Sequence, residues 1–154
     1  MALLLVINLH GKINSTRATR RALGEMKVEK KFTASVLTDD GTTVGMLKSC
    51  KDFLAWGPLE KETLTTLLEK KGMVSERKRL GSEALAELGA KSYEELAGRM
   101  LDQGLGLSAL KGVRPFFRLS PPRGGFKKSL RRQSSDGGVL GRNPNLVEIV
   151  GRMV

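Results

Sequence analysis

The side chains that most often perform catalysis or bind metal ions are scarce in this sequence. It has one histidine, His10, and one cysteine, Cys50, and these two residues cannot supply the four ligands of a structural zinc site. His10 has no evident partner for acid–base work, and Cys50 is more typical of a small core residue than of a reactive thiol. Asp39 and Asp40 precede Gly41, a pattern typical of a turn. The sequence therefore predicts no enzyme activity, no metal site and no cofactor.

One segment in the last third of the chain has a composition suited to binding phosphate. Residues 119–128 read LSPPRGGFKK. Gly124 and Gly125 lack a Cβ, so backbone N–H groups beside them can approach a phosphate closely. Phe126 could stack on an exposed base. Positive charge stands on either side of the glycines, at Arg123, Lys127 and Lys128. The alternative interpretation of this segment is an ordinary flexible loop.

The net charge favours a polyanionic partner. The chain has 27 Lys and Arg against 16 Asp and Glu, a formal charge of +11. Residues 105–154 hold 10 basic and 2 acidic side chains, so +8 of the excess lies in the last third. A cation that neutralises a phosphate releases a condensed counterion, which favours binding to nucleic acid. The alternative, that the lysines and arginines only keep the surface soluble, does not explain this concentration of charge.

Length and hydropathy predict one ordinary domain or a small domain with an appendage. The chain has 154 residues, of which 40% are hydrophobic, enough for a sizeable core. Its longest apolar run, residues 2–7, is much shorter than the ~20 residues that cross a bilayer, and no basic segment precedes it as in a signal peptide. We therefore expect a soluble, cytoplasmic protein with no membrane contact and no internal disulfide.

The first 71 residues alternate between patterns for strands and helices. We expect strands over residues 2–7, 32–36 and 53–56, and helices over 17–26, from Thr42 or Thr43 onward, and over 60–71. In the second strand, alternation predicts that Phe32, Ala34 and Val36 are buried. This order is typical of an α+β fold, with a split β-α-β unit whose small antiparallel sheet carries helices on one face.

The second half predicts helices, then a strand and an irregular arm. A helical unit begins at Ser82 and ends at Gly89, and a capping box of Ser92 and Glu95 opens another that ends at Gly104. Residues 115–119 suit an edge strand because proline donates no hydrogen bond. We expect an irregular arm over residues 121–145 that gains order from a partner, and one or two helical turns after Leu146. The predicted parts are a core module (1–60), a helical extension (61–112) and the edge strand, basic arm and C-terminal segment (113–154).

Several of these features together resemble the long archaeal and eukaryotic form of the large-subunit ribosomal protein uL30 family. The resemblance covers essentially the whole chain, and its most specific part is residues 117–125, FRLSPPRGG, with Lys127 and Lys128. Other matching features are residues 3–9, Gly11, Asn14, residues 45–47, 55–57, 70–72, 77–79, 92–96, 137–138 and 141–142. One departure is Val44, where many relatives have an arginine.

The resemblance implies a ferredoxin-like module with a C-terminal extension, present as a single copy in the large ribosomal subunit. Its implied partners are ribosomal RNA, including the region near the 5S RNA, and neighbouring ribosomal proteins, with no enzyme activity. A free-standing RNA chaperone or regulatory RNA-binding protein is the alternative. We expect phosphates to be bound from the module by Lys12, Arg17, Arg20, Arg21, Lys48 and Lys51. Further contacts are expected from Arg77, Lys78, Arg79, Arg114, Arg118, Arg123, Gly124, Gly125, Lys127, Lys128, Arg131, Arg132 and Arg142.

Overall fold

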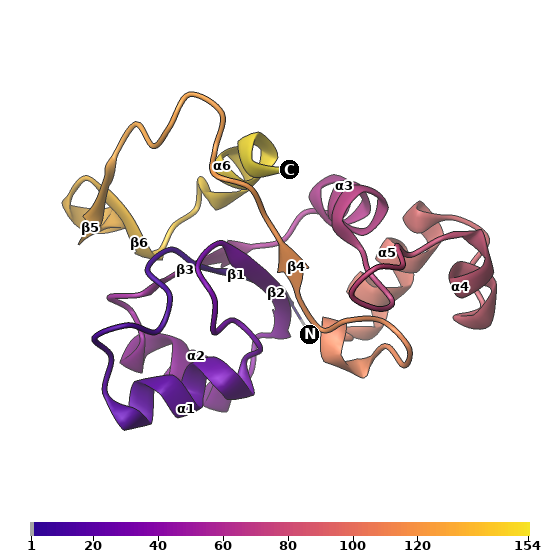
Figure 1. Cartoon of the computed structure of the whole chain (residues 1–154), viewed down its shortest axis with the longest axis horizontal. Coiled ribbons are helices and arrows are strands. Elements are labelled where there is room, and N and C mark those ends of the chain that lie inside the picture. Colours follow the sequence, from indigo (N-terminus) through magenta and orange to yellow (C-terminus); the bar gives the residue numbers. More distant parts are fainter. Residues whose placement is uncertain (1) are drawn as a thin grey trace.

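The chain folds around one six-stranded mixed sheet, with helices on both of its faces. The computed structural model describes residues 2–154 (Figure 1). The strand order across the sheet is β4-β2-β1-β3-β6-β5. The strands are β1 (Leu3–Asn8), β2 (Thr33–Thr38), β3 (Leu54–Pro58), β4 (Phe117–Arg118), β5 (Ser129–Gln133) and β6 (Gly138–Arg142). The predicted α+β class is confirmed.

The N-terminal half forms the expected β-α-β-α-β module. Its two helices are α1 (Arg17–Glu25) and α2 (Gly41–Ser49), and β1 pairs antiparallel with both β2 and β3. The Thr16 hydroxyl accepts a hydrogen bond from the backbone N–H of Thr19 at the start of α1, as a capping residue does. The predicted caps Thr42 and Thr43 are wrong, because α2 begins one residue after Asp40 and both threonines lie within its first turn.

The second strand differs from its predicted pattern at the start. Phe32 has a positive φ of 60° and stands before the strand, where it is half-buried rather than buried. Thr33 and Ser35 are buried together with Ala34 and Val36. Polar and apolar residues therefore alternate along these four positions, but both sets are buried and neither face of the strand is exposed there. The reason is that both faces of this sheet are covered, and a strand in such a sheet loses the alternation of exposure.

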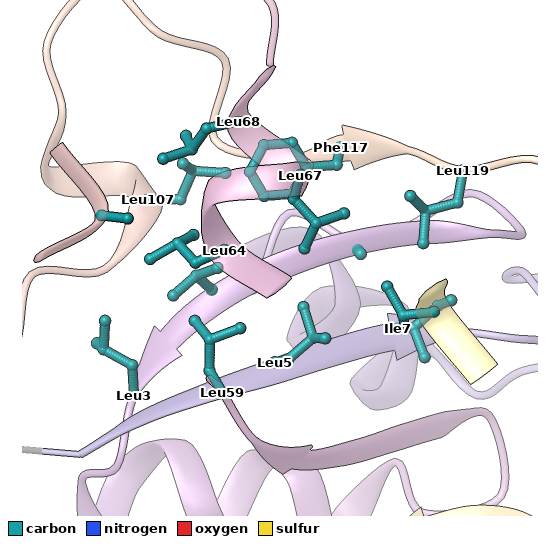
Figure 2. Packing of buried hydrophobic residues seen from close by; sticks show 14 of the residues in the cluster. Leu3, Leu5, Ile7, Leu59, Leu64, Leu67, Leu68, Leu107, Phe117 and Leu119 are labelled. Carbon is teal, nitrogen blue, oxygen red and sulfur yellow. The ribbon is translucent and has the colours of Figure 1, made fainter. Parts of the chain in front are cut away.

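Two hydrophobic clusters lie on opposite faces of the sheet. Val6 faces α1 and α2 and packs with Leu23, Leu47 and Trp56. The other face of β1, with Leu5 and its neighbours, packs beneath α3 (Lys61–Lys71), as Figure 2 shows. Cluster members labelled there are Leu3, Leu5, Ile7, Leu59, Leu64, Leu67, Leu68, Leu107, Phe117 and Leu119. Burial on both faces therefore holds β1 in the centre of the fold.

The middle of the chain is helical, as expected. It contains α4 (Ser82–Glu87), α5 (Tyr93–Gln103) and a short 3-10 helix, η1 (Leu107–Ala109). Ser92 accepts from the backbone N–H of Glu95, and α5 ends at Gly104 in a left-handed conformation (φ 62°), both as predicted. Helix α5 packs against α3. The division of the chain at residues 60 and 112 stays a prediction.

The predicted irregular arm over residues 121–145 is wrong in its second half. Strand β6 lies in the sheet beside β3, in parallel pairing of Ala55 with Gly141, and Val139 and Leu140 are buried. Strand β5 pairs parallel with β6, and a short 3-10 helix, η2 (Ser134–Asp136), joins them. Residues 119–128 and 143–145 have no helix or strand in this region. Four residues of β6 are buried, but only Val139 and Leu140 have large apolar side chains, and two such residues between glycines are too few to be distinguished from a loop by periodicity.

The C-terminal segment and the edge strand follow the predictions. Helix α6 (Leu146–Met153) buries Leu146, Val150 and Met153 in the same cluster as Leu5. Strand β4 lies at the edge of the sheet, beside β2. Within residues 2–154, no helix is both long and apolar enough to cross a membrane.

Candidate nucleic-acid interface

Nearly all of the predicted RNA-binding cations are accessible. Arg114 is half-buried, and the other predicted lysines and arginines are exposed. They come from every part of the chain, from the loop after β1 to strand β6. Val44 is half-buried in α2, so this position presents no charge.

Most of these cations are free of carboxylate partners. Four make ion pairs, which are Lys12–Glu29 (3.5 Å), Arg21–Glu25 (3.2 Å), Lys78–Glu83 (3.9 Å) and Arg114–Glu76 (3.6 Å). The first three pairs are exposed on both sides, and such pairs contribute little to stability, so a phosphate can replace the carboxylate at small cost. Within residues 2–154 no ion pair is formed by Arg17, Arg20, Lys48, Lys51, Arg77, Arg79, Arg118, Arg123, Lys127, Lys128, Arg131, Arg132 or Arg142.

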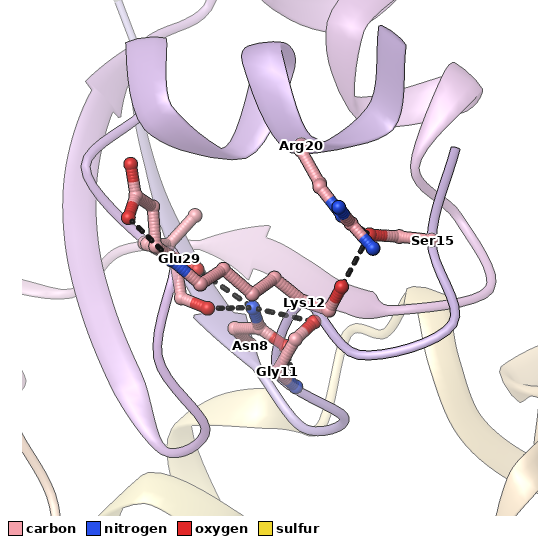
Figure 3. Close-up of polar contacts among 7 residues, drawn as sticks. Asn8, Gly11, Lys12, Ser15, Arg20 and Glu29 are labelled. Atoms are coloured by element: carbon pink, nitrogen blue, oxygen red, sulfur yellow. Dashed lines mark hydrogen bonds and ion pairs between the residues drawn. The ribbon is translucent and has the colours of Figure 1, made fainter. Parts of the chain in front are cut away.

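The loop between β1 and α1 is held in place by the buried side chain of Asn8 (Figure 3). Asn8 Oδ1 accepts from the backbone N–H groups of His10 (3.0 Å) and Gly11 (2.8 Å). Its Nδ2 donates to the carbonyl oxygen of Val28 (2.6 Å), after α1. The side-chain amide of Asn8 therefore bonds to the backbone both before α1, at residues 10 and 11, and after it, at residue 28. Sequence reasoning missed this role, although an asparagine at the end of an apolar strand is a signal for such a turn.

This fixed loop brings two of the predicted cations together. Lys12 and Arg20 line a hollow of about 420 Å³ with Ile13. The Arg20 Nε donates to the Ser15 hydroxyl (3.3 Å), whose Oγ in turn donates to the carbonyl oxygen of Lys12. Ile13 is 78% exposed at the tip of the loop, and sequence reasoning did not single it out. The hollow thus combines an apolar side chain with two cations and one acid, Glu29.

His10 has a structural position. Its Nε2 lies 2.6 Å from the carbonyl oxygen of Leu130 in β5. This contact joins the N-terminal module to the C-terminal strands. Gln133 of β5 makes a second link, because its Nε2 donates to the carbonyl oxygen of Lys51 (3.2 Å). Strand β5, which includes the exposed residues Arg131 and Arg132, is therefore anchored to the module at two points.

The PPRGG segment is attached to helix α6. The backbone N–H of Ser120 donates to the carbonyl oxygen of Met153, and that of Arg123 donates to the carbonyl oxygen of Arg152, both at 3.1 Å. Gly124 and Gly125 have positive φ angles of 77° and 74°, which favours glycine. A Cβ at either position would meet no atom within 4 Å, so the glycines serve the turn and leave the backbone open to solvent.

A basic pocket lies where this segment meets α3 and α6. The pocket, of about 530 Å³, brings Arg79 and Arg123 together from positions far apart in the sequence. Three further cations line it, which are Lys70, Lys71 and Arg152, with Glu69 as the one acidic side chain among its lining residues. Sequence reasoning placed Lys70 and Lys71 at the end of a predicted helix and among the family-like features, but not in the RNA-binding set, and it did not single out Arg152. Nothing in their spacing indicates that the fold brings these residues together.

Phe126 does not present a free ring. It is half-buried, and its ring stacks on Phe32 with centroids 6.2 Å apart and planes 25° apart. Both rings pack against the cluster that contains Leu5. One face of the Phe126 ring is therefore used within the protein, and its stacking on a base stays a prediction.

The groups considered for chemistry form no catalytic constellation. Cys50 is buried, and burial raises the pKa of its thiol, an effect that the neighbouring Ser49 hydroxyl partly opposes. A buried thiol with a raised pKa is a poor nucleophile. In the part of the chain that the structure describes, no three His, Cys, Asp or Glu side chains gather as metal ligands would.

Fold and surface together define a class of protein. It is a small α+β protein whose sheet is covered on both faces and whose exposed cations stand largely without acidic partners. No model of a known protein family matches the chain.

Individual relatives are similar over its full length. The large ribosomal subunit protein uL30 of Thermofilum pendens is 38% identical, with 100% of both chains covered. The protein of the same name from Nanoarchaeum equitans is 33% identical, again over 100% of both chains. That of Nitrosopumilus maritimus is 36% identical over 97% of each. The chain belongs to the uL30 family of large ribosomal subunit proteins.

Proposed function

We propose that this protein is a structural component of the large ribosomal subunit that binds and braces ribosomal RNA. It performs no turnover. Its cations neutralise the repulsion between neighbouring RNA segments, and the shape and charge of the RNA backbone matter more than base sequence. Membership of the uL30 family supports this role, as does the charge of +11.

The observation that carries the proposal is the basic pocket shared by Arg79 and Arg123. Five cations from α3, the following loop, the PPRGG segment and α6 surround one hollow with a single acidic side chain. Like charges brought together in this way repel one another, and a phosphate group removes that repulsion. A surface whose only task was solubility would gain nothing from gathering these cations around one hollow.

The RNA-binding surface in this proposal comprises the predicted cations and the three that the fold adds. From the module these are Lys12, Arg17, Arg20, Arg21, Lys48 and Lys51. From the rest of the chain they are Lys70, Lys71, Arg77, Lys78, Arg79, Arg114, Arg118, Arg123, Lys127, Lys128, Arg131, Arg132, Arg142 and Arg152, with the backbone at Gly124 and Gly125.

Salt dependence tests the electrostatic mechanism. If about six phosphates are neutralised, the logarithm of the binding constant for large-subunit ribosomal RNA falls with the logarithm of salt concentration at a slope of about −4 to −5. Filter binding between 50 and 400 mM KCl measures this slope. A flat response contradicts the proposal, because contacts with phosphates would then contribute little.

Sedimentation distinguishes this role from a free-standing RNA chaperone or regulator. A subunit component migrates with large subunits in a sucrose gradient of cell extract, whereas a chaperone remains mostly near the top. The uL30 family membership favours the first outcome. We further propose one copy per subunit and contacts near the 5S RNA, which chemical protection of the RNA with and without the protein would locate.

A further inference from the structure

Another pocket lies beside the edge strand β4, and residues from the end of α1 to Thr33 line it together with residues 114, 116 and 118. It has a volume of about 560 Å³, within the range of small-molecule sites. Thr33 and Arg118 are paired across β2 and β4 and contribute to its lining. Lys27 and Lys30, after helix α1, and Phe116, just before β4, line it as well. The pocket therefore combines an aromatic ring, a hydroxyl group and several cations.

The aromatic part of the pocket is flat and already carries a charge. The guanidinium carbon of Arg114 lies 5.1 Å from the ring centroid of Phe116, and both side chains are half-buried. Planar bases stack on aromatic rings and on guanidinium planes alike. Because Arg114 covers one face of Phe116, a base can stack on the guanidinium plane of Arg114 or on the opposite face of the ring.

The cationic part of the pocket is available to an anion. Arg114 is paired with Glu76, and the other acid of the pocket, Glu29, is paired with Lys12. Lys27, Lys30 and Arg118 form no ion pair with any residue in the range 2–154 and are exposed. These three cations can hold a phosphate group.

The two carboxylates restrict what else can enter. Glu29 and Glu76 line the same pocket as the cations, so a bare stretch of phosphates running across it would meet negative charge. Carboxylate oxygens accept hydrogen bonds from amino groups on base edges. A ligand with a phosphate at one end and a planar ring with N–H donors at the other matches all of these groups at once.

We propose that this pocket binds one unstacked nucleotide of an RNA, with its base on Phe116 and its phosphate near Lys30 and Arg118. This inference rests on the proposed function and specifies one of its contacts. A base in a helix is stacked between its neighbours, so the nucleotide must come from a bulge, a loop or a strand end. The pocket therefore adds recognition of local RNA structure to a surface that otherwise binds phosphate.

Nucleoside 5′-monophosphates are the probes for this site. We expect AMP, GMP or CMP at millimolar concentration to shift the amide NMR signals of Thr33, Phe116 and Arg118 in the intact protein. Ribose 5-phosphate, which lacks a base, is the matched ligand control and should bind at least fivefold more weakly. Equal binding of the two would overturn the proposal in favour of a simple anion site. No shift at 20 mM nucleotide would also overturn it.

Two variants separate the base from the phosphate. Phe116→Leu should weaken nucleotide binding at least fivefold and leave ribose 5-phosphate unaffected. Arg118→Ala, at an exposed position on the edge strand, should weaken both ligands. Lys91→Ala removes an exposed cation in the loop between α4 and α5 and should change neither. If Phe116→Leu lowers the melting temperature, Arg118→Ala still decides whether the phosphate lies in this pocket.

Photolabelling decides between an RNA nucleotide and a free one. 8-Azido-AMP should label the peptide that contains Phe116, and prior binding of large-subunit ribosomal RNA should block the label. Labelling that persists on the RNA-bound protein would overturn the assignment to RNA. The test of the pocket is separate from the test of the proposed function. A protein that binds ribosomal RNA with a steep salt slope but does not bind nucleotides refutes only the pocket. A protein that does not bind ribosomal RNA refutes the proposed function.

Discussion

The backbone N–H of Arg123 donates to the carbonyl oxygen of Arg152 at 3.1 Å, and the Arg152 guanidinium donates in return to the carbonyl oxygen of Gly125 at 3.0 Å. This reciprocal pair attaches the PPRGG segment to the last turn of α6. The side chains of Arg123, Lys127 and Lys128 nevertheless remain exposed. The backbone of the segment is therefore shaped by the protein, while its charges are left for a partner.

Replacing Arg123, Lys127 and Lys128 together by Ala is expected to weaken binding to large-subunit ribosomal RNA. Three lost phosphate contacts should reduce the salt slope by about two to three units. The melting temperature should change little, because exposed side chains contribute little to the core and the backbone bonds to α6 persist. Filter binding and thermal unfolding measure the two effects.

A charge-matched variant provides the control for this change. Lys61, Lys91 and Lys111 are exposed and lie outside the proposed surface, so replacing all three by Ala removes the same charge. This control should lose less affinity and keep the salt slope of the unmodified protein. Equal losses for the two triple variants would show that only net charge matters.

Asn8→Ala is expected to destabilise the fold by about 1–3 kcal/mol. The change removes the acceptor for the N–H groups of His10 and Gly11 and the donor to the carbonyl oxygen of Val28. Because Asn8 is fully buried, water cannot easily replace these hydrogen bonds. Urea unfolding measures the loss. Asn145→Ala, at an exposed position, serves as the control, and equal stability of the two variants would contradict the role given to Asn8.

Gly57→Ala is expected to separate β6 from the sheet. A Cβ at position 57 would collide with the carbonyl oxygen of Asn143 and press on Leu146, so the seam between β3 and the C-terminal strands must open. Limited proteolysis should then cut the region after β5 faster than in the unmodified protein. Gly45→Ala is the matched control, because nothing lies within 4 Å of its Cβ and an alanine in the exposed middle of α2 should stabilise by about 0.5–1 kcal/mol.

The N-terminal module could be predicted from the sequence because its signals are local. An apolar run and helical spacing each act within a few residues, and β1 and α1 follow them closely. Strand β6 could not be predicted in this way. Its burial depends on pairing with β3, more than 80 residues earlier in the chain. Its glycines, including Gly141 with a positive φ of 78°, are residues that a sequence pattern assigns to a turn.

The candidate site shows the same limit. Charge counting identified Arg79 and Arg123, but it could not place them in one hollow with Lys70, Lys71 and Arg152, because that meeting is created by the docking of α6. Phe126 is the reverse case. Its neighbours suggest a free RNA-binding loop, whereas the ring is half-buried and stacks on Phe32, a contact across more than 90 residues that no local pattern indicates.

The stability of the protein is expected to fall at alkaline pH in part through Cys50. Burial raises the pKa of this thiol in the folded state above its ordinary value of 9.0, so the folded protein keeps the proton to a higher pH than the unfolded chain does. The contribution of the protonated Cys50 thiol to the free energy of unfolding is complete below pH 9, and it is lost as the pH rises through the folded-state pKa. Urea unfolding of the unmodified protein and of Cys50→Ala between pH 7 and 10.5 isolates the effect of this thiol, because the two proteins share every other side chain. Above pH 9, the free energy of unfolding should fall more steeply with pH for the unmodified protein than for Cys50→Ala. A steeper fall for Cys50→Ala would contradict a buried, protonated thiol.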